Sequence, residues 1–184
     1  MSDPLAIRRR NRLKMVLVAS VFLLPAIVAA ALALAGWQPG AKSHGEPILP
    51  QRSFGDVRIV LADGSAYAWR DSEPRMTLVA LPGSDCAANC VRLLTLMRNA
   101  RITLGKNSDR LRLLYVGEPP VGVDALMKQW QVGHDVDGKL EGFRPRGPDS
   151  VAAVLVESNA TALSRYRAGF DPNGLKQDLQ KVIR

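Results

Sequence analysis

An uninterrupted apolar segment near the N-terminus is the clearest pattern in the chain. The twenty-one residues from Met15 to Ala35 carry no charge. At 1.5 Å per residue they would form a helix of about 30 Å, which matches the hydrocarbon core of a bilayer. Pro25 lies within the segment, and transmembrane helices tolerate proline. We therefore predict a single transmembrane helix at 15–35, between a basic tail at 1–14 and a linker at 36–51.

A cleaved signal peptide is the alternative interpretation of this segment. Ala33-Leu34-Ala35 has the small-x-small pattern that precedes a cleavage site. The apolar stretch is longer than the roughly 7 to 15 residues of a signal h-region, which favours a retained anchor. Either interpretation exports the rest of the chain.

Short apolar runs separated by turn residues predict the strands of an exported domain at 52–184. Phe54–Leu61 and Ser65–Trp69 alternate around a turn at 62–64, which predicts a β-hairpin. A continuous apolar run predicts a buried strand at Met76–Leu81, and two further buried strands are predicted at Leu111–Val116 and Val151–Val156. The last of these turns into Ala162–Tyr166 and forms a second predicted hairpin.

Helical periodicity begins at Ala87, and the positions of Cys90, Leu94 and Met97 share one face. A short helix is predicted at Val123–Trp130, whereas Gln131–Asp149 gives little periodic signal. Asp171 followed by Pro172 is typical of a capped helix start, and an apolar stripe continues the closing helix at Leu175, Leu179, Val182 and Ile183. Strands alternating with helices predict an α/β fold, with a partly parallel sheet and an antiparallel edge.

Charge changes this picture only at the N-terminus. The chain has 25 basic and 17 acidic residues and a net charge of +8. Five basic residues and one acid precede the apolar segment, so 5 − 1 = +4 of that charge lies in the tail. Basic residues on this side predict a cytoplasmic N-terminus. The other charges are mixed and only ten residues are aromatic, so we predict no binding of nucleic acid.

Cys86 and Cys90 are the only cysteines, placed where the first buried strand gives way to the first long helix. Positions i and i+4 of a helix lie about 6 Å apart at Cα, within the range of a disulfide. A helix N-terminus stabilises a thiolate, so Cys86 is expected to be the nucleophile. Thiolates take part in disulfide exchange and also bind soft metals.

A purely structural disulfide is the other interpretation of this pair, because an oxidising compartment would form it in any case. Closing a loop of so few residues removes little chain entropy, so the bond would stabilise the fold only slightly. The position of the pair at a strand-to-helix turn therefore favours redox or metal chemistry.

An exported, membrane-anchored domain with an N-terminal hairpin and Cys86-Ala-Ala-Asn-Cys90 after its first core strand resembles the Sco family of cytochrome c oxidase assembly proteins. The resemblance covers roughly Arg52 to the C-terminus and implies a thioredoxin-like fold. In that family both cysteines and one histidine bind copper, and the domain either metallates the dinuclear copper centre of oxidase subunit II or reduces its cysteines. The resemblance thus implies copper(I) as a ligand of Cys86 and Cys90.

Three positions depart from the family pattern. Ala87, Ala88 and Val91 stand where the family usually has prolines, and Gly117-Glu118-Pro119-Pro120 replaces an Asp-Pro motif. The copper-binding histidine precedes the family's equivalent of the strand Val151–Val156, where this chain reads Pro148-Asp149-Ser150. The third ligand is therefore missing.

Two histidines and one proline bear on this site. His44 falls in the predicted linker and His134 in the Gly-rich connection, and a histidine in a polar loop is more often a solvated group than a ligand. Pro148 falls where thioredoxin folds place a cis-proline beside the redox cysteines. An ordinary trans loop proline is the alternative.

These observations lead to two hypotheses. The first is a membrane-anchored, periplasmic assembly factor for cytochrome c oxidase, in the bacterial inner membrane, with oxidase subunit II or other assembly factors as partners. It acts by thiol-disulfide exchange, with Cys86 attacking and Cys90 resolving, or by transient copper(I) binding. The second is a non-catalytic scaffold with a structural disulfide that associates with respiratory membrane subunits. Whether the protein is an enzyme stays open; if so, it is a thiol-disulfide oxidoreductase.

Overall fold

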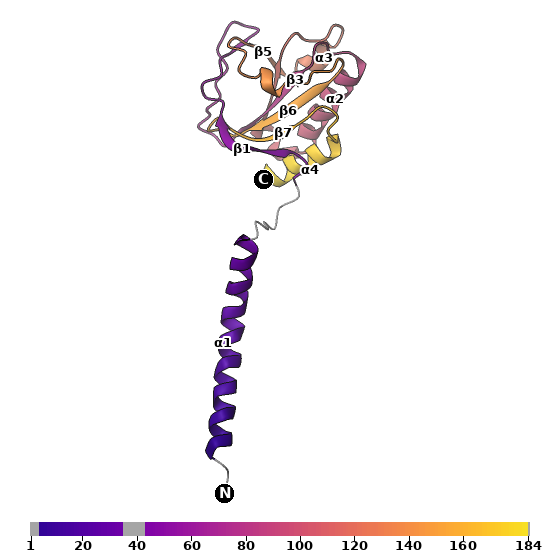
Figure 1. The fold of residues 1–184 in the computed structure, drawn as a ribbon. Coiled ribbons are helices and arrows are strands. Elements are labelled where there is room, and N and C mark those ends of the chain that lie inside the picture. Colours follow the sequence, from indigo (N-terminus) through magenta and orange to yellow (C-terminus); the bar gives the residue numbers. More distant parts are fainter. Residues whose placement is uncertain (1–3, 35–42, 184) are drawn as a thin grey trace. The chain divides into compact units, whose positions relative to one another are not determined.

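The chain divides into two compact units, Met1–Lys42 and Ser43–Arg184, in a computed structural model that describes residues 4–34 and 43–183. The first unit contains helix α1, Pro4–Leu34, and the second contains the sheet and all other described helices (Figure 1). The predictions for residues 1–3, for Ala35 at the end of the apolar segment and for the linker at 36–42 lie outside the described residues.

Helix α1 runs for 31 residues and continues through Pro25. The helix begins at Pro4, within the predicted basic tail, whereas the apolar segment begins at Met15. Large apolar side chains along it are exposed, including Phe22 at 75%, Leu23 at 58% and Leu24 at 60%. Judged over the described residues alone, no helix meets the length and hydropathy that a membrane crossing requires.

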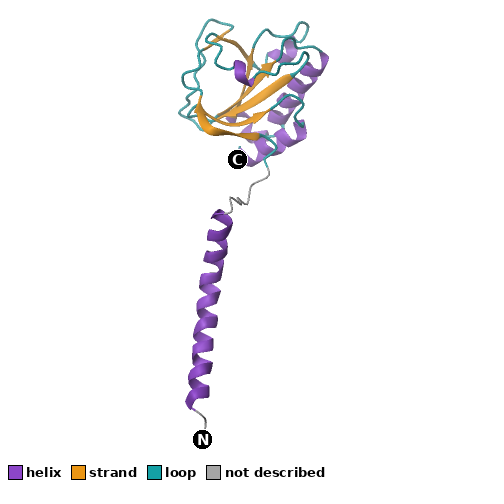
Figure 2. Ribbon diagram, viewed as in Figure 1, coloured by secondary structure: helices purple, strands orange, loops and turns teal. Residues whose placement is uncertain are grey.

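A seven-stranded mixed sheet, in the order β1-β7-β6-β3-β4-β5-β2, forms the second unit (Figure 2). β3, β4 and β5 are parallel, and every other pairing is antiparallel. The predicted combination of a parallel centre and an antiparallel edge is thus confirmed. The strands are β1 Glu46–Ser53, β2 Ile59–Leu61, β3 Met76–Pro82, β4 Leu111–Val116, β5 Gln131–Asp135, β6 Val151–Val156 and β7 Thr161–Tyr166.

Helices α2 and α4 pack on one face of this sheet, together with the short helix α3. Their bounds are α2 Ala88–Ile102, α3 Asp124–Met127 and α4 Pro172–Val182, and 3-10 turns lie at Gly105–Arg110 and Glu141–Phe143. The predicted cap of α4 is confirmed, since the Asp171 carboxylate accepts from the backbone N–H groups of Asn173 and Gly174. The apolar stripe of α2 is buried as predicted.

The central strands are buried on both faces, which explains why their sequences are mostly apolar. Along β3, Leu78 contributes to the core beneath the helices, and the next residue, Val79, contributes to the core on the opposite face. The opposite face is covered by Phe54, Trp69 and Phe143 from the segments before β3 and after β5. Because both sides are packed, β3 and β4 form a rigid base for the loops at their carboxyl ends.

The N-terminal hairpin is shorter than the alternation predicted. Its first arm forms a strand only at β2, and its second arm contributes one bridge, from Ala66 to Val60. The Leu61 N–H donates to the Ser65 carbonyl at 2.8 Å, so the turn itself is present. The alternation placed Phe54 and Trp69 in strands. Instead their rings pack edge to face over the sheet, with centroids 5.3 Å apart.

Two further strands were not predicted. β5 falls where Gly133, His134 and Asp135 interrupt any apolar alternation, but β4 and β2 pair with it on both sides. Its extended form therefore depends on these partners more than on its own residue preferences. β1 overlaps the segment predicted as a linker, and the compact unit begins at Ser43 instead of Arg52.

One buried carboxylate holds the start of this unit in place. Asp178 on α4 is 4% exposed, and its Oδ2 accepts from the backbone N–H groups of His44 at 2.7 Å and Gly45 at 3.0 Å. The same oxygen accepts from the hydroxyls of Ser43 and Tyr166. Burial alone would raise the pKa of Asp178, but these hydrogen bonds, led by those from Gly45 and His44, outweigh it and lower the pKa.

We expect Asp178→Ala to lower the free energy of unfolding by about 2–4 kcal/mol, because it leaves buried donors without an acceptor. Ser43→Ala, which removes one donor, should cost less than about 1 kcal/mol. The pKa of Asp178 is lower in the folded than in the unfolded protein. Its contribution to stability is therefore fully present above the unfolded pKa of about 3.9 and is lost as the pH falls through the folded pKa. Urea unfolding followed by tryptophan fluorescence measures both effects, and equal losses in the two variants would contradict the assignment.

Candidate functional site

The two cysteines lie where β3 ends and α2 begins, at the carboxyl edge of the parallel strands. They form a disulfide, with the sulfurs 1.98 Å apart and the Cα atoms 5.1 Å apart. The predicted pairing is therefore confirmed. Cys86 lies two residues ahead of the first helical residue, Ala88, while Cys90 belongs to the first turn of α2. The pair thus joins the loop to the helix, whereas the sequence placed both cysteines on one helical face.

The two cysteines differ in accessibility. Cys90 is fully buried among Leu94, Met97 and the rest of the core beneath the helices. Cys86 is partly exposed and lines a surface pocket of about 410 Å³. A thiol partner arriving from solvent can therefore reach Cys86, whereas Cys90 can be reached only through Cys86.

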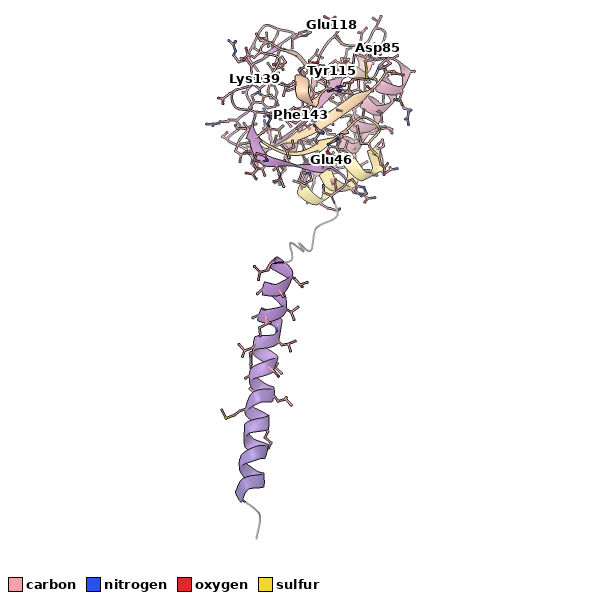
Figure 3. The ribbon with its side chains drawn as sticks, viewed as in Figure 1. Glu46, Asp85, Tyr115, Glu118, Lys139 and Phe143 are labelled. Carbon is pink, nitrogen blue, oxygen red and sulfur yellow. A yellow bond between two sulfur atoms is a disulfide. The ribbon has the colours of Figure 1, made fainter. Side chains whose placement is uncertain are left out.

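The pocket beside Cys86 is formed by the loops that follow β3 and β4. Figure 3 shows Asp85, Tyr115 and Glu118 at the end of the domain away from Glu46. The Tyr115 hydroxyl donates to the Glu118 carbonyl at 2.9 Å, and burial raises the pKa of Tyr115 to about 12. Tyr115 therefore stays protonated at neutral pH and forms a fixed wall of the pocket.

Arg144 closes another side of the pocket. Its guanidinium donates to the Pro82 carbonyl at 3.1 Å and to the Val116 carbonyl at 2.9 Å, which are the last residues of β3 and β4. Its Nε also lies 3.3 Å from the Glu141 carboxylate. Arg144 thus joins the two strand ends, and its charge is already paired with carbonyl and carboxylate oxygens.

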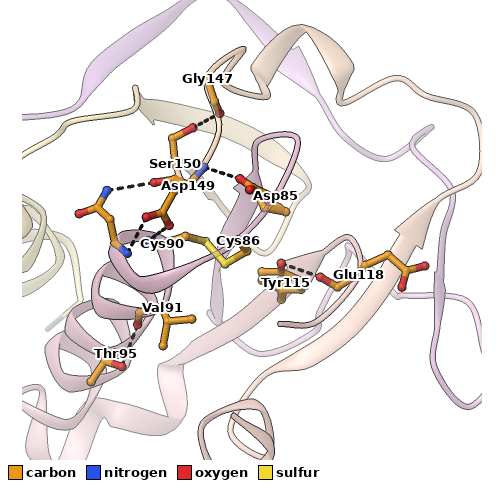
Figure 4. The surroundings of a disulfide bond; sticks show 12 residues. Asp85, Cys86, Cys90, Val91, Thr95, Tyr115, Glu118, Gly147, Asp149 and Ser150 are labelled. Atoms are coloured by element: carbon orange, nitrogen blue, oxygen red, sulfur yellow. Dashed lines mark hydrogen bonds between the residues drawn. A yellow bond between two sulfur atoms is a disulfide. The ribbon is translucent and has the colours of Figure 1, made fainter. Parts of the chain in front are cut away.

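The carboxylate of Asp149 caps the helix that carries the cysteines (Figure 4). Oδ2 accepts from the backbone N–H of Asn89 at 2.9 Å, and Oδ1 accepts from the N–H of Cys90 at 2.8 Å. These hydrogen bonds, first that from Cys90 and then that from Asn89, lower the pKa of Asp149. Ala87, the residue at the N-cap position, has no side-chain acceptor, so an acidic residue about sixty positions away performs the capping.

The loop that carries Asp149 is packed closely against the loop that carries Cys86. The Asp149 N–H donates to the Asp85 carboxylate at 2.5 Å, and the Gly83 N–H donates to the Ser150 carbonyl at 2.9 Å. A Cβ atom at Gly83 would overlap the carbonyl oxygen of Gly147, so only glycine fits there. Asp149 itself has a φ of 44°, in the left-handed region that aspartate tolerates better than most residues.

The other residues singled out by sequence lie elsewhere. His134 is exposed on β5, paired with Val60, and His44 is exposed ahead of β1; neither lines the pocket. Pro148 lies in the Asp149 loop, but among the described residues the only cis peptide bond is Leu49–Pro50. Pro148 is therefore trans, which agrees with the ordinary loop proline and not with the cis interpretation.

The residues at the site do not fit a copper ion with three ligands. Asp149 stands where the resemblance placed the third ligand, and both of its oxygens already accept helix N–H groups. A carboxylate is also a hard ligand, poorly matched to copper(I). Across 4–34 and 43–183, no group of three or more His, Cys, Asp or Glu side chains could hold a metal ion.

Sequence reasoning did not anticipate the role of Asp149. A signal was present, because a helix that starts at Ala87-Ala88 lacks the Ser, Thr, Asp or Asn that usually caps a helix. The first N–H groups of the helix therefore need an acceptor from another segment or from water. Which loop supplies it depends on β6 lying next to β3, and that order is not visible in either segment alone.

Comparison with solved structures agrees with the thioredoxin-like fold. Copper-bound ScoI of Arabidopsis thaliana has a TM-score of 0.51 and 13% identity, over 76% of this chain and 98% of that one. Peroxidoxin BcpB of Mycobacterium tuberculosis also has a TM-score of 0.51, with 11% identity over 76% and 95% of the two chains. At such identities the likeness shows the fold alone. No curated protein matches the sequence significantly.

A family model matches residues 76–184, more than half of the chain, which includes both cysteines and the Asp149 loop. Its description combines a thioredoxin-like fold with a transmembrane-like character. The sheet, the Cys86–Cys90 disulfide at the first strand-to-helix turn and this match agree with one another. The chain belongs to the family of transmembrane-like, thioredoxin-like C-terminal domains.

Proposed function

We propose that this chain is a membrane-held thiol-disulfide exchange protein that acts on exported partner proteins through Cys86 and Cys90. One observation carries the proposal: Cys86 opens onto a pocket, while Cys90 is buried directly behind it in the disulfide. An attacking cysteine needs access to its partner, and a resolving cysteine needs access only to the first cysteine. A disulfide that served only as a crosslink would add little to the stability of the fold, because it closes so short a loop.

The exchange reaction follows from this arrangement. When the pair is reduced, the Cys86 thiolate attacks one sulfur of a partner disulfide and releases the partner's first thiolate. The Cys90 thiolate then attacks the Cys86 sulfur, releases the partner's second thiolate and re-forms the intramolecular bond. Two electrons pass to the partner, and the released thiolates take up two protons. A second dithiol protein re-reduces the pair by the reverse steps.

The partner in this proposal is a component of cytochrome c oxidase assembly, either oxidase subunit II or another assembly factor. The resemblance of Cys86 and Cys90 to the thiol pair of the Sco family supports this choice. Metal-binding cysteines must be reduced before they can take up copper, and thiol-disulfide exchange supplies that step. Copper(I) binding by this chain is not part of the proposal, because Asp149 replaces the third ligand.

The proposed location is a bacterial inner membrane, with the N-terminus in the cytoplasm and the domain in the periplasm. The exposed apolar side chains of α1 support an anchoring role, because α1 is the one element described in its unit and these side chains are not packed against another. The basic residues ahead of Met15 set the orientation.

We expect the Cys86–Cys90 couple to have a reduction potential above about −300 mV, the range of exchangeable disulfides. Equilibration of the full-length protein with dithiol redox buffers, followed by thiol labelling, measures it. A potential well below that value would mark an inert bond. The proposal would then give way to the scaffold hypothesis, in which the disulfide is structural.

After reduction, we expect Cys86 to react with iodoacetamide at least tenfold faster than Cys90, because only Cys86 lines the pocket. Cys90→Ser and Cys86→Ser are the matched variants, since each leaves one of the two thiols in the same fold. Mass spectrometry of the labelled chains gives the two rates. Equal rates would remove the assignment of Cys86 as the attacking residue.

A reporter enzyme fused after Arg184 should be active only on the periplasmic side of the inner membrane. The same fusion with Arg8, Arg9, Arg10, Arg12 and Lys14 changed to Gln is the control, and it should lose its uniform orientation. Reporter activity confined to the cytoplasm would overturn both the location and the choice of partner.

A further inference from the structure

The helix that carries the redox pair has an unusual source of negative charge at its N-terminus. The N–H groups of Asn89 and Cys90 belong to the first turn, whose donors have no partner within the helix. In α4 the same need is met locally by Asp171, immediately ahead of the first turn. In α2 it is met by Asp149 from a loop that also packs against the residues before Cys86.

This cap changes the electrostatics of the cysteines. A helix N-terminus carries about half a positive unit charge, which stabilises a nearby thiolate. Asp149 brings a full negative charge to the same N–H groups, and its lowered pKa keeps it ionised at neutral pH. At these N–H groups the sum of the helix charge and the carboxylate charge is therefore negative, opposite to what the position at a helix start predicts.

Within residues 4–34 and 43–183, no arginine or lysine forms a salt bridge with Asp149. Asp85, which accepts from the Asp149 N–H, and Glu118, on the pocket wall, add negative charge. Arg144 adds positive charge to the pocket, but its guanidinium is held at the Pro82 and Val116 carbonyls and at Glu141, away from the helix N–H groups. Arg146, on the same loop as Asp149, lines a separate pocket beside Gly83 and Ser84. Arg92 donates to the Asn89 side chain at 3.0 Å and lies one helical turn further along.

We infer that Asp149 is a positioning residue that favours the disulfide form of the Cys86–Cys90 pair by occupying the helix N–H groups that would otherwise stabilise a thiolate. A couple whose reduced form is not stabilised has a low reduction potential and gives up its electrons readily. The residue that replaces the third metal ligand thus makes the pair a reductant of partner disulfides. This direction of electron flow rests on the proposed function; the effect of Asp149 on the couple does not.

Asp149→Asn tests the charge with the least change of shape. Asparagine tolerates a positive φ and keeps one acceptor oxygen, so the loop can retain its conformation. In full-length protein in detergent, equilibrated with a dithiol redox buffer at pH 7, we expect the equilibrium constant for reduction to rise about tenfold. For a two-electron couple this corresponds to about +30 mV. The rate of Cys86 alkylation at the same pH should rise with it.

Asp171→Asn is the matched control. It makes the same substitution at the capping carboxylate of α4, whose partners are Asn173 and Gly174 and not a cysteine-bearing turn. We expect Asp171→Asn to lower the free energy of unfolding about as much as Asp149→Asn does. The equilibrium constant for reduction of the disulfide should stay within twofold of the wild-type value. An unchanged constant in Asp149→Asn, or an equal rise in Asp171→Asn, would overturn the inference.

The dependence on ionic strength gives a second test, which uses the wild-type protein and needs no variant. Since salt screens a partly exposed charge, raising KCl from 0.05 to about 1 M should increase the equilibrium constant of the wild-type protein severalfold. A constant that does not respond to salt would also count against the inference. The two proposals fail separately: a wild-type potential far below about −300 mV rejects the exchange function, whereas the ratio of mutant to wild type tests Asp149 alone.

Discussion

The hydrogen bonds from the first turn of α2 to the Asp149 carboxylate are the contact on which the candidate site depends. They join the loop ahead of β6 to the helix that begins after β3, and so fix the position of Cys90 relative to Cys86. Without an acceptor from this loop, a helix that starts at Ala88 would leave its first donors to water. One side chain thus completes a secondary structure, joins two loops and sets the charge around a disulfide.

The rigidity of the surrounding sheet makes this contact reproducible. β3 is paired on both sides, by β4 and β6, and its side chains are buried on both faces. The loops after β3 and before β6 therefore start from fixed points on neighbouring strands, and Pro82 lies directly opposite Val151. Residues that follow one strand and precede the next come together at this edge, which is why the pocket and the disulfide lie there.

The parts of the fold that the sequence predicted are those whose information is local. β4 and β6 have the predicted bounds because their sequences are almost entirely apolar and are bounded by charged, polar or glycine residues. The cap of α4 was visible because Asp171 and Pro172 stand next to each other. β5 and β1 were missed because their extended form depends on pairing with strands far away in the sequence.

The same distinction separates the two halves of the candidate site. The cysteine pair could be predicted from spacing, but the residue that controls its environment could not, because Asp149 lies about sixty positions away in a segment without periodic signal. Its identity still has a clear chemical consequence. A histidine there could give a soft-metal ligand, whereas a carboxylate is a hard donor, and both oxygens of Asp149 already accept hydrogen bonds from helix N–H groups. In the proposed function, the two cysteines of this thioredoxin-like fold therefore act by transferring electrons.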